Sequence, residues 1–267
     1  MLRDITLGQF FPGNSPLHRM DPRVKIIWTL FFVVLLFFVD HYLGFLLVGL
    51  FTAAVIAISG IRPRFVFSGL RPLLFLLLFT AALNVFMSGG ETVLFKFWIL
   101  TATKEGVYAA GIMVLRLAFL VIGSSMLTFT TSPIVLTDGI EHLLRPFSKI
   151  GVPAHEIAMM MTIAIRFIPT ILEETDKIMK AQTARGADFE SGNLFKRAKA
   201  MIPLLIPLFI SAFRRADELA VAMECRGYHG GEGRSRMHVL KISAVDIKTI
   251  PFAILLAIGV IATRIYL

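Results

Sequence analysis

The chain has 267 residues, of which 56% are hydrophobic and only 17% are charged, and its mean hydropathy is +0.77. A soluble domain is usually about 45–50% apolar and about 25% charged, so the composition excludes an ordinary soluble enzyme and indicates an integral membrane protein. The net charge of +9 fits basic loops beside anionic lipid headgroups better than a nucleic-acid surface. We therefore expect the lipid bilayer as a partner and no nucleic acid.

The first 22 residues mix polar and apolar side chains around glycines and prolines. They lack the basic start, apolar core and cleavage site of a signal peptide, so we interpret them as a cytoplasmic segment that leads into the membrane. Cys225 is the only cysteine, and a lone cysteine allows no disulfide within the chain.

Five apolar segments approach the length of about 20 residues that crosses about 30 Å of hydrocarbon. They are Val24–Val39, Leu43–Ile61, Pro72–Gly90, Gly106–Thr131 and the shorter Thr249–Thr263. Arg116 is the one charged residue of the fourth segment. A charge at such a position is costly and usually faces protein or water, so Arg116 is either an intramembrane functional residue or one half of a structural ion pair.

Loop charges predict the orientation. Lys and Arg collect before the first segment and between the second and third, whereas the link 40–42 has neither and residues 88–105 have only two. Because cytoplasmic loops are enriched in Lys and Arg, we expect the N-terminus in the cytoplasm and, after five crossings, the C-terminus outside.

Residues 132–249 differ from the rest because they carry many charges of both signs and still follow helical patterns. Ser132-Pro133 is a helix-start signal. Two long stripes of apolar residues at helical spacing follow, one from Ile157 and one from Phe195. Prolines inside the stripes, namely Pro169, Pro203 and Pro207, should kink these helices.

Each long stripe ends in a similar tripeptide, Ala184-Arg185-Gly186 in the first and Cys225-Arg226-Gly227 in the second. An aspartate stands nine residues before each arginine, which suggests a weak internal repeat. A cation favours a helix C-terminus, and glycine can adopt the left-handed conformation that stops the helix, so ordinary caps explain each end. Two matched ends with small neighbours also fit two charged tips that enter two grooves of a partner and contact carboxylates.

Motifs for chemistry are absent from the sequence. No G-x-x-x-x-G-K-[ST] phosphate loop, H-E-x-x-H pair or G-x-S-x-G serine occurs, and the six histidines lack zinc spacing. We therefore expect no enzyme activity, no metal site and no cofactor.

The segment Ser15-Pro16-Leu17-His18-Arg19-Met20-Asp21-Pro22-Arg23-Val24-Lys25 resembles the N-terminal signature of EcfT, the transmembrane (T) component family of energy-coupling factor (ECF) transporters. The two Arg-Gly ends resemble that family's coupling motifs, with Cys225 where alanine is common. The likeness covers essentially the whole chain.

The resemblance implies a multi-pass protein of a bacterial cell membrane that works with two ABC-type ATPase subunits and a membrane S component. The S component would bind a vitamin or another micronutrient, and Arg185 and Arg226 would each dock in one ATPase. A T component dedicated to cobalt, nickel or biotin is an alternative, and a stand-alone secondary transporter is a weaker one.

The expected fold is an all-α integral membrane protein, with about five transmembrane helices and a cytoplasmic coupling region of long kinked amphipathic helices. The expected domains are 1–131 with the lead-in and four transmembrane helices, 132–249 with the coupling helices, and 250–267 with the last transmembrane helix.

Overall fold

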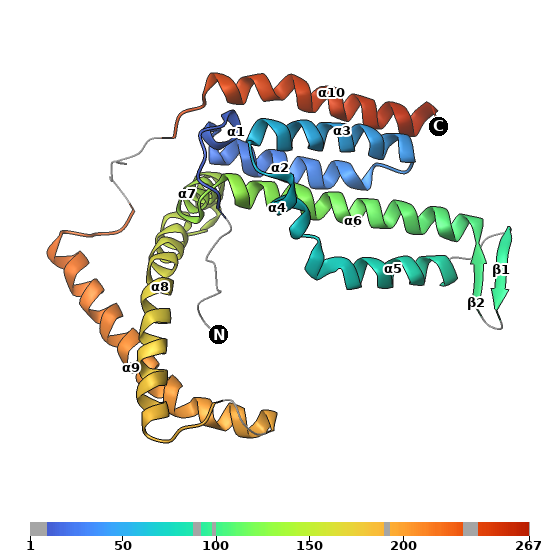
Figure 1. Cartoon of the computed structure of the whole chain (residues 1–267). Helices are drawn as coiled ribbons and strands as arrows, with labels where there is room; N and C mark the ends of the chain where they lie inside the picture. Colours follow the sequence, from blue (N-terminus) through green and yellow to red (C-terminus); the bar gives the residue numbers. More distant parts are fainter. Residues whose placement is uncertain (1–9, 88–91, 98–99, 190–192, 232–239, 267) are drawn as a thin grey trace. The chain divides into compact units, whose positions relative to one another are not determined.

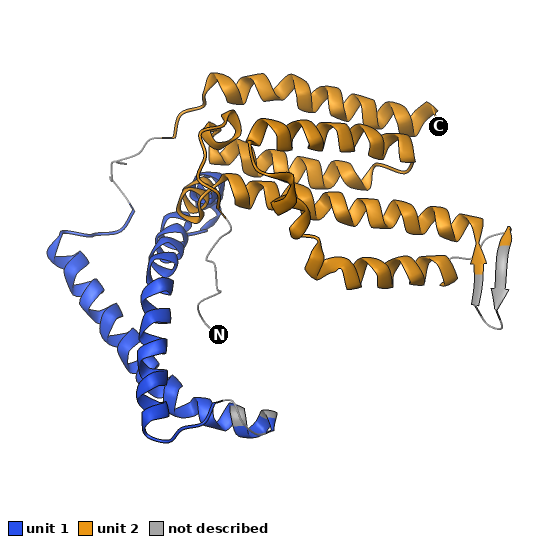
Figure 2. Ribbon diagram, in the orientation of Figure 1, with its two compact units in different colours: residues 1–7, 140–238 blue, residues 8–139, 239–267 orange. Residues whose placement is uncertain are grey.

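The structure is a computed structural model that describes residues 10–87, 92–97, 100–189, 193–231 and 240–266. The chain forms two compact units (Figure 2). Unit 1 comprises Met1–Leu7 and Ile140–His238, and unit 2 comprises Gly8–Gly139 and Val239–Leu267.

Unit 2 is built from long apolar helices that run side by side (Figure 1). They are α2 (Pro22–Phe37), α3 (Tyr42–Ser59), α5 (Leu74–Met87), α6 (Lys104–Thr130) and α10 (Ala244–Tyr266). Helix α6 packs against α2, α3 and α5, and α10 packs against α2 and α3. The side chains of α5 that face away from this bundle include Phe75, which is 80% exposed. Apolar side chains exposed on a helix of this composition suit contact with lipid.

Short elements connect these helices. They are α1 (Pro16–Arg19), α4 (Pro63–Ser68), the 3₁₀ turn η2 (Arg71–Leu73), and an antiparallel hairpin of β1 (Val93–Phe97) and β2 (Leu100–Thr103). The hairpin lies where the sequence predicted only an external loop. The predicted class, an all-α integral membrane protein, is nevertheless confirmed, because the spanning elements of the described residues are helices.

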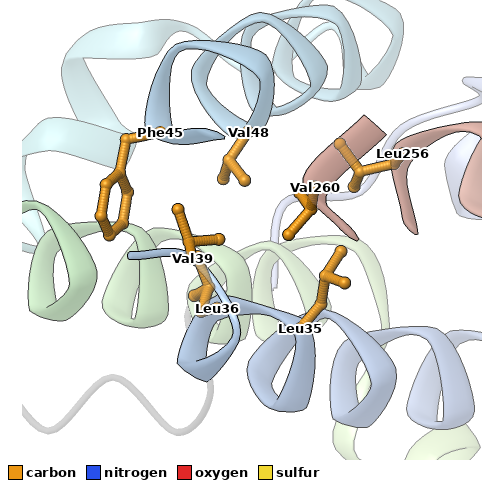
Figure 3. Close-up of a cluster of buried hydrophobic side chains, with 7 residues drawn as sticks. All are labelled: Leu35, Leu36, Val39, Phe45, Val48, Leu256 and Val260. Carbon is orange, nitrogen blue, oxygen red and sulfur yellow. The ribbon is translucent and has the colours of Figure 1, made fainter. Parts of the chain in front are cut away.

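The main core of unit 2 lies where α2, α3 and α10 meet (Figure 3). It is a cluster of buried aliphatic and aromatic side chains: Leu35, Leu36, Val39, Phe45, Val48, Leu256 and Val260. Between helices in lipid, association depends on van der Waals packing more than on removal of apolar surface from water. The fully enclosed Val48 and Val260 show that close packing is achieved here.

Five helical segments of the described residues are long and apolar enough to cross a membrane, which agrees with the predicted number of about five. They are Tyr42–Ser59, Pro63–Met87, Lys104–Thr130, Ala154–Ala184 and Ala244–Tyr266. Four overlap predicted spans. The first predicted span forms α2, whose 16 residues rise only about 24 Å. This length is shorter than the hydrocarbon core of about 30 Å that a spanning helix crosses. The fifth segment, Ala154–Ala184, belongs to the predicted coupling region, and it is long and apolar enough to cross a membrane.

The last transmembrane helix is longer than the sequence analysis predicted. It begins at Ala244 rather than at Thr249. The charged residues Asp246 and Lys248 precede the predicted span, yet both lie in the helix, and Asp246 is buried in its first turn.

Unit 1 contains two long helices, α8 (Ala154–Ala184) and α9 (Leu194–Cys225). They follow α7 (Pro133–Leu144), which begins in unit 2, and the 3₁₀ helix η3 (Arg145–Ile150). Pro169 lies inside α8, and Pro203 and Pro207 lie inside α9. Figure 1 shows a bend within α9, in line with the loss of backbone hydrogen bonds that proline causes.

Candidate functional site

Both Arg-Gly tips end their helices with the same backbone geometry. At the first tip, the amide of Gly186 donates to the carbonyl of Thr183 (2.9 Å) and the amide of Ala187 donates to that of Gln182 (3.0 Å). This pair of bonds is the Schellman cap, and it requires a left-handed residue at the glycine. Gly186 has φ +90°, as the sequence analysis predicted.

The second tip repeats this geometry bond for bond. The amide of Gly227 donates to Glu224 (2.9 Å) and that of Tyr228 donates to Met223 (3.0 Å), and Gly227 has φ +71°. Because these bonds use backbone atoms, neither arginine side chain is needed to close its cap. The residues of both tripeptides are exposed, so each cap leaves a guanidinium group free to contact another molecule.

Helices α8 and α9 are joined by a polar contact centred on Glu174. Its carboxylate accepts a hydrogen bond from Ser211 Oγ (2.5 Å) and forms an ion pair with Arg215 (2.9 Å). The side chains of Glu174 and Arg215 are 24% and 37% exposed. An apolar groove runs beside this contact; its lining includes Phe167, Ile171, Ala212, Leu219 and Met223.

The ion pair joins equivalent positions of the weak repeat. Glu174 and Arg215 are 41 residues apart, and so are the two tip arginines. Each partner therefore lies eleven residues before the tip of its own helix, a distance of about 16 Å along an α-helix. The two helices meet at matching points, and their tips lie equally far from the meeting point.

Arg116 has an acidic partner, which the sequence analysis did not find. Its guanidinium group donates to the carbonyl oxygen of Val39 (2.8 Å) and lies 3.5 Å from Asp40 Oδ1. Arg264 pairs with the other carboxylate oxygen of Asp40 at 3.4 Å. Asp40 comes from the link between α2 and α3, not from a span. This geometry favours a structural ion pair over an intramembrane functional residue.

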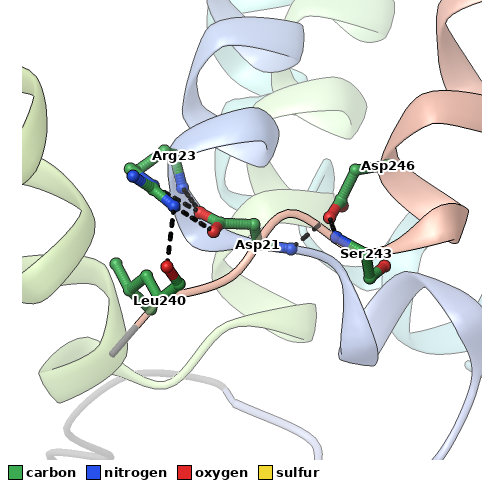
Figure 4. Close-up of polar contacts among 5 residues, drawn as sticks. All are labelled: Asp21, Arg23, Leu240, Ser243 and Asp246. Atoms are coloured by element: carbon green, nitrogen blue, oxygen red, sulfur yellow. Dashed lines mark hydrogen bonds and ion pairs between the residues drawn. The ribbon is translucent and has the colours of Figure 1, made fainter. Parts of the chain in front are cut away.

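The N-terminal signature forms a buried polar cluster that the sequence analysis did not foresee (Figure 4). Asp21 caps α2 by accepting from the amide of Arg23, whose guanidinium group returns two bonds to the same carboxylate. Arg23 also donates to the carbonyl oxygen of Leu240 (3.3 Å). The amide of Asp21 donates to Asp246 Oδ1 (3.0 Å), and Asp246 Oδ2 accepts from the amide of Ser243 (2.6 Å).

Lys25 extends this cluster to the end of α6. Its ammonium group donates to the carbonyl oxygen of Thr130 (3.0 Å), to Thr131 Oγ1 (3.1 Å) and to the carbonyl oxygen of His18 (3.3 Å). Asp21, Lys25 and Asp246 are at most 6% exposed. A buried charge must be paired and hydrogen-bonded, and here two acids and two bases balance one another. We call Asp21, Arg23, Lys25 and Asp246 the signature cluster.

Among the described residues, no group of three or more His, Cys, Asp or Glu side chains is placed to hold a metal ion. The candidate site is therefore a pair of exposed charged tips, one on each of the two paired helices α8 and α9 of unit 1. The helices of membrane-spanning length and composition define the class of the chain, a multi-pass helical membrane protein.

Similarity to known proteins identifies the family of this chain. Residues 13–239 match the family described as cobalt transport protein, CbiQ. The energy-coupling factor transporter transmembrane protein EcfT of Clostridium kluyveri is 55% identical over 267 residues, covering 100% of this chain and 99% of that protein. The EcfT protein of Bacillus subtilis is 44% identical over 96% of this chain and 97% of its own length. The chain therefore belongs to the EcfT family, the T components of ECF transporters, and the predicted resemblance is confirmed.

Proposed function

We propose that this chain couples ATP hydrolysis by two cytoplasmic ATPase subunits to substrate uptake through a membrane S component. The chain is not itself the enzyme in this scheme, because its sequence has no phosphate loop. The relatives' names, which describe transmembrane proteins of energy-coupling factor transporters, support the assignment.

The observation that carries the proposal is the pair of matched tips. Two caps with the same hydrogen bonds present Arg185 and Arg226 on exposed helix ends. Each guanidinium group can form two parallel hydrogen bonds with a carboxylate in a groove of one ATPase subunit. The small neighbours Ala184 and Cys225 let a tip enter a narrow groove, and Gly186 and Gly227 turn the chain away behind it.

Coupling then follows from the joint between α8 and α9. When ATP binding draws the two ATPase subunits together, the two tips move with them. The Glu174–Arg215 contact lets each helix act on the other about 16 Å from its tip. The exposed apolar side chains of α9, such as Phe209 and Phe213, suit a partner that is itself apolar, as a membrane S component is.

This function requires residues 132–249 on the cytoplasmic side, with 1–131 and 250–267 forming the membrane part. We accordingly propose a cytoplasmic N-terminus and an external C-terminus. The loop charges support this orientation.

The proposal is tested by arginine replacement. Arg185→Ala or Arg226→Ala should weaken ATP-driven uptake, because removing a buried charge-assisted contact is expected to lose roughly 2–5 kcal/mol of binding. The double change should abolish uptake or release the ATPase subunits. Arg→Lys should rescue poorly, since lysine has no planar fork. The thermal stability of the isolated chain should stay nearly unchanged, because the caps use backbone atoms.

Co-purification identifies the partners in the same experiment. The tagged wild-type chain should bring down two ATPase subunits and a small membrane protein, and the isolated chain should not bind ATP. Normal uptake by the double variant at wild-type membrane levels would mean that the arginines are ordinary helix caps. A T component dedicated to cobalt, nickel or biotin would instead retain one S component regardless of which others are supplied.

A further inference from the structure

The signature cluster connects three segments that are far apart in the sequence. Lys25 binds the end of α6 through Thr130 and Thr131. On the other side, the backbone amide of Asp21 donates to the carboxylate of Asp246 in the first turn of α10, and Arg23 donates to the carbonyl oxygen of Leu240. All these residues lie in unit 2.

These contacts fall where the chain departs for the coupling helices and where it comes back. Thr131 is the residue before Ser132, the start of the predicted coupling region, and α7 begins at Pro133. After the coupling helices, the first described residue that lies in unit 2 is Leu240. Residues 18–25 therefore contact both the segment that leads into the coupling helices and the segment that follows them, although more than 100 residues separate these two segments.

Packing around the cluster is also tight. A Cβ atom added to Gly139 of α7 would lie 3.1 Å from Pro22 Cβ and 3.1 Å from the side chain of Ile26, so any larger residue at this position would require a neighbour to shift. One turn further along α2, Trp28 donates to Thr249 of α10 (3.1 Å). The connection is thus both polar and steric.

We propose that residues 18–25 act as a clamp, in which Asp21, Arg23, Lys25 and Asp246 are positioning residues for energy coupling. This inference rests on the proposed function. Tip movement can reorient the membrane helices only if the ends of α6 and α10 cannot slide past one another. The clamp makes these two ends move together, so displacement of the coupling helices reaches the bundle as a whole.

The burial of Asp21, Lys25 and Asp246, beside the partly exposed Arg23, explains why charged residues serve this purpose. Arg23 pairs directly with Asp21, and Lys25 is attracted by the charges of Asp246 and Asp21, so removing one member leaves a charge uncompensated in this site, which is unfavourable. The cluster therefore has one well-satisfied arrangement, and partial opening on either side disturbs the other side. A clamp of this kind should respond as a single unit.

The first test uses the purified chain without partners and measures backbone hydrogen exchange. Lys25→Met removes the bonds to Thr130, Thr131 and His18 and none to α10, yet it should raise amide exchange at Ser243 and Asp246 as well as near Thr131. Thr131→Val, which removes one bond without stranding a charge, should give a smaller change of the same pattern. Arg19→Met is the matched control, because Arg19 is exposed in the same segment and should leave exchange unchanged. Unaltered exchange at Ser243 and Asp246 in Lys25→Met would overturn the clamp.

The second test uses the assembled transporter in proteoliposomes and measures uptake and ATP hydrolysis together. Lys25→Met and Asp246→Asn should each lower the substrate taken up per ATP hydrolysed, by about fivefold or more, while hydrolysis continues. The double variant should be no worse than the poorer single variant. Additive losses, or parallel falls in uptake and hydrolysis at a constant ratio, would refute the clamp. Absence of ATP-driven uptake in the wild-type assembly would instead refute the proposed function.

Discussion

Exchanging the charges of Glu174 and Arg215 tests whether the α8–α9 joint fixes the spacing of the two tips. Glu174→Arg and Arg215→Glu each replace an ion pair at 2.9 Å by two like charges. The exchange variant carrying both changes restores an opposite-charge pair at the same place. Ser211 can serve both arrangements, because its hydroxyl group accepts as well as donates.

The expected size of the effect follows from the exposure of the pair. The two side chains are 24% and 37% exposed, so the pair lies between exposed pairs, worth about 0.2–1 kcal/mol, and buried pairs, whose disruption costs about 3–5 kcal/mol. We expect each single reversal to destabilise the joint by about 1–2 kcal/mol, a factor of about 5–30 in population. That is enough to open the joint in a measurable fraction of molecules without unfolding either helix.

Spin labels at equivalent positions near the tips provide the assay. Ala181 and Ala222 are both exposed and lie four residues before Arg185 and Arg226. Labels are attached to Ala181→Cys and Ala222→Cys in a Cys225→Ser background. The distance distribution between them should be narrow in the parent, broad in each single reversal and narrow again in the exchange variant. An exchange variant as broad as the single reversals, or single reversals as narrow as the parent, would refute the joint.

Two further predictions concern the membrane part. In a Cys225→Ser background, cysteines that replace Lys104 and Tyr266 should react with a membrane-impermeant reagent from outside. Cysteines that replace Ser68 and Ala181 should react only from the cytoplasm. External labelling of Ala181→Cys would mean that α8 crosses the membrane and would overturn the proposed topology. Arg116→Gln should lower the melting temperature of the chain, because it leaves Asp40 with Arg264 as its only basic partner among these residues. The amount of substrate taken up per ATP should stay unchanged. ATP hydrolysis without uptake in an assembled Arg116→Gln transporter would contradict the structural interpretation of this residue.

Much of the fold could be predicted because membrane spans and helix stops have local causes. Long apolar runs locate α3, α5, α6 and α10 to within a few residues. The two tips were predictable to the residue, since arginine followed by glycine satisfies a helix end through backbone geometry alone. Here the conformation of Gly186 and Gly227 depends on nothing distant in the chain.

The parts that escaped prediction depend on contacts between distant segments. Asp246 lies outside the predicted span, and its partner is the amide of Asp21, 225 positions away in the sequence. Asp40, the acidic partner of Arg116, lies outside the predicted spans and 76 positions away in the sequence. The hairpin of β1 and β2 carries no turn signal strong enough to distinguish it from a loop. For Asp246 and Asp40, the local sequence permits the structure and a distant residue selects it, whereas the hairpin pairs neighbouring segments.

The repeat shared by α8 and α9 gives a reason for their joint. If two similar ATPase subunits approach each other about a twofold axis, equal displacements reach both tips. Helices joined at unequal distances from their tips would turn that symmetric input into unequal movements. A joint between residues 41 positions apart, the spacing of the tip arginines themselves, keeps the two lever arms equal. We therefore expect the joint to matter more for the ratio of uptake to hydrolysis than for the stability of the chain, and Glu174→Gln should lower that ratio while the melting temperature changes little.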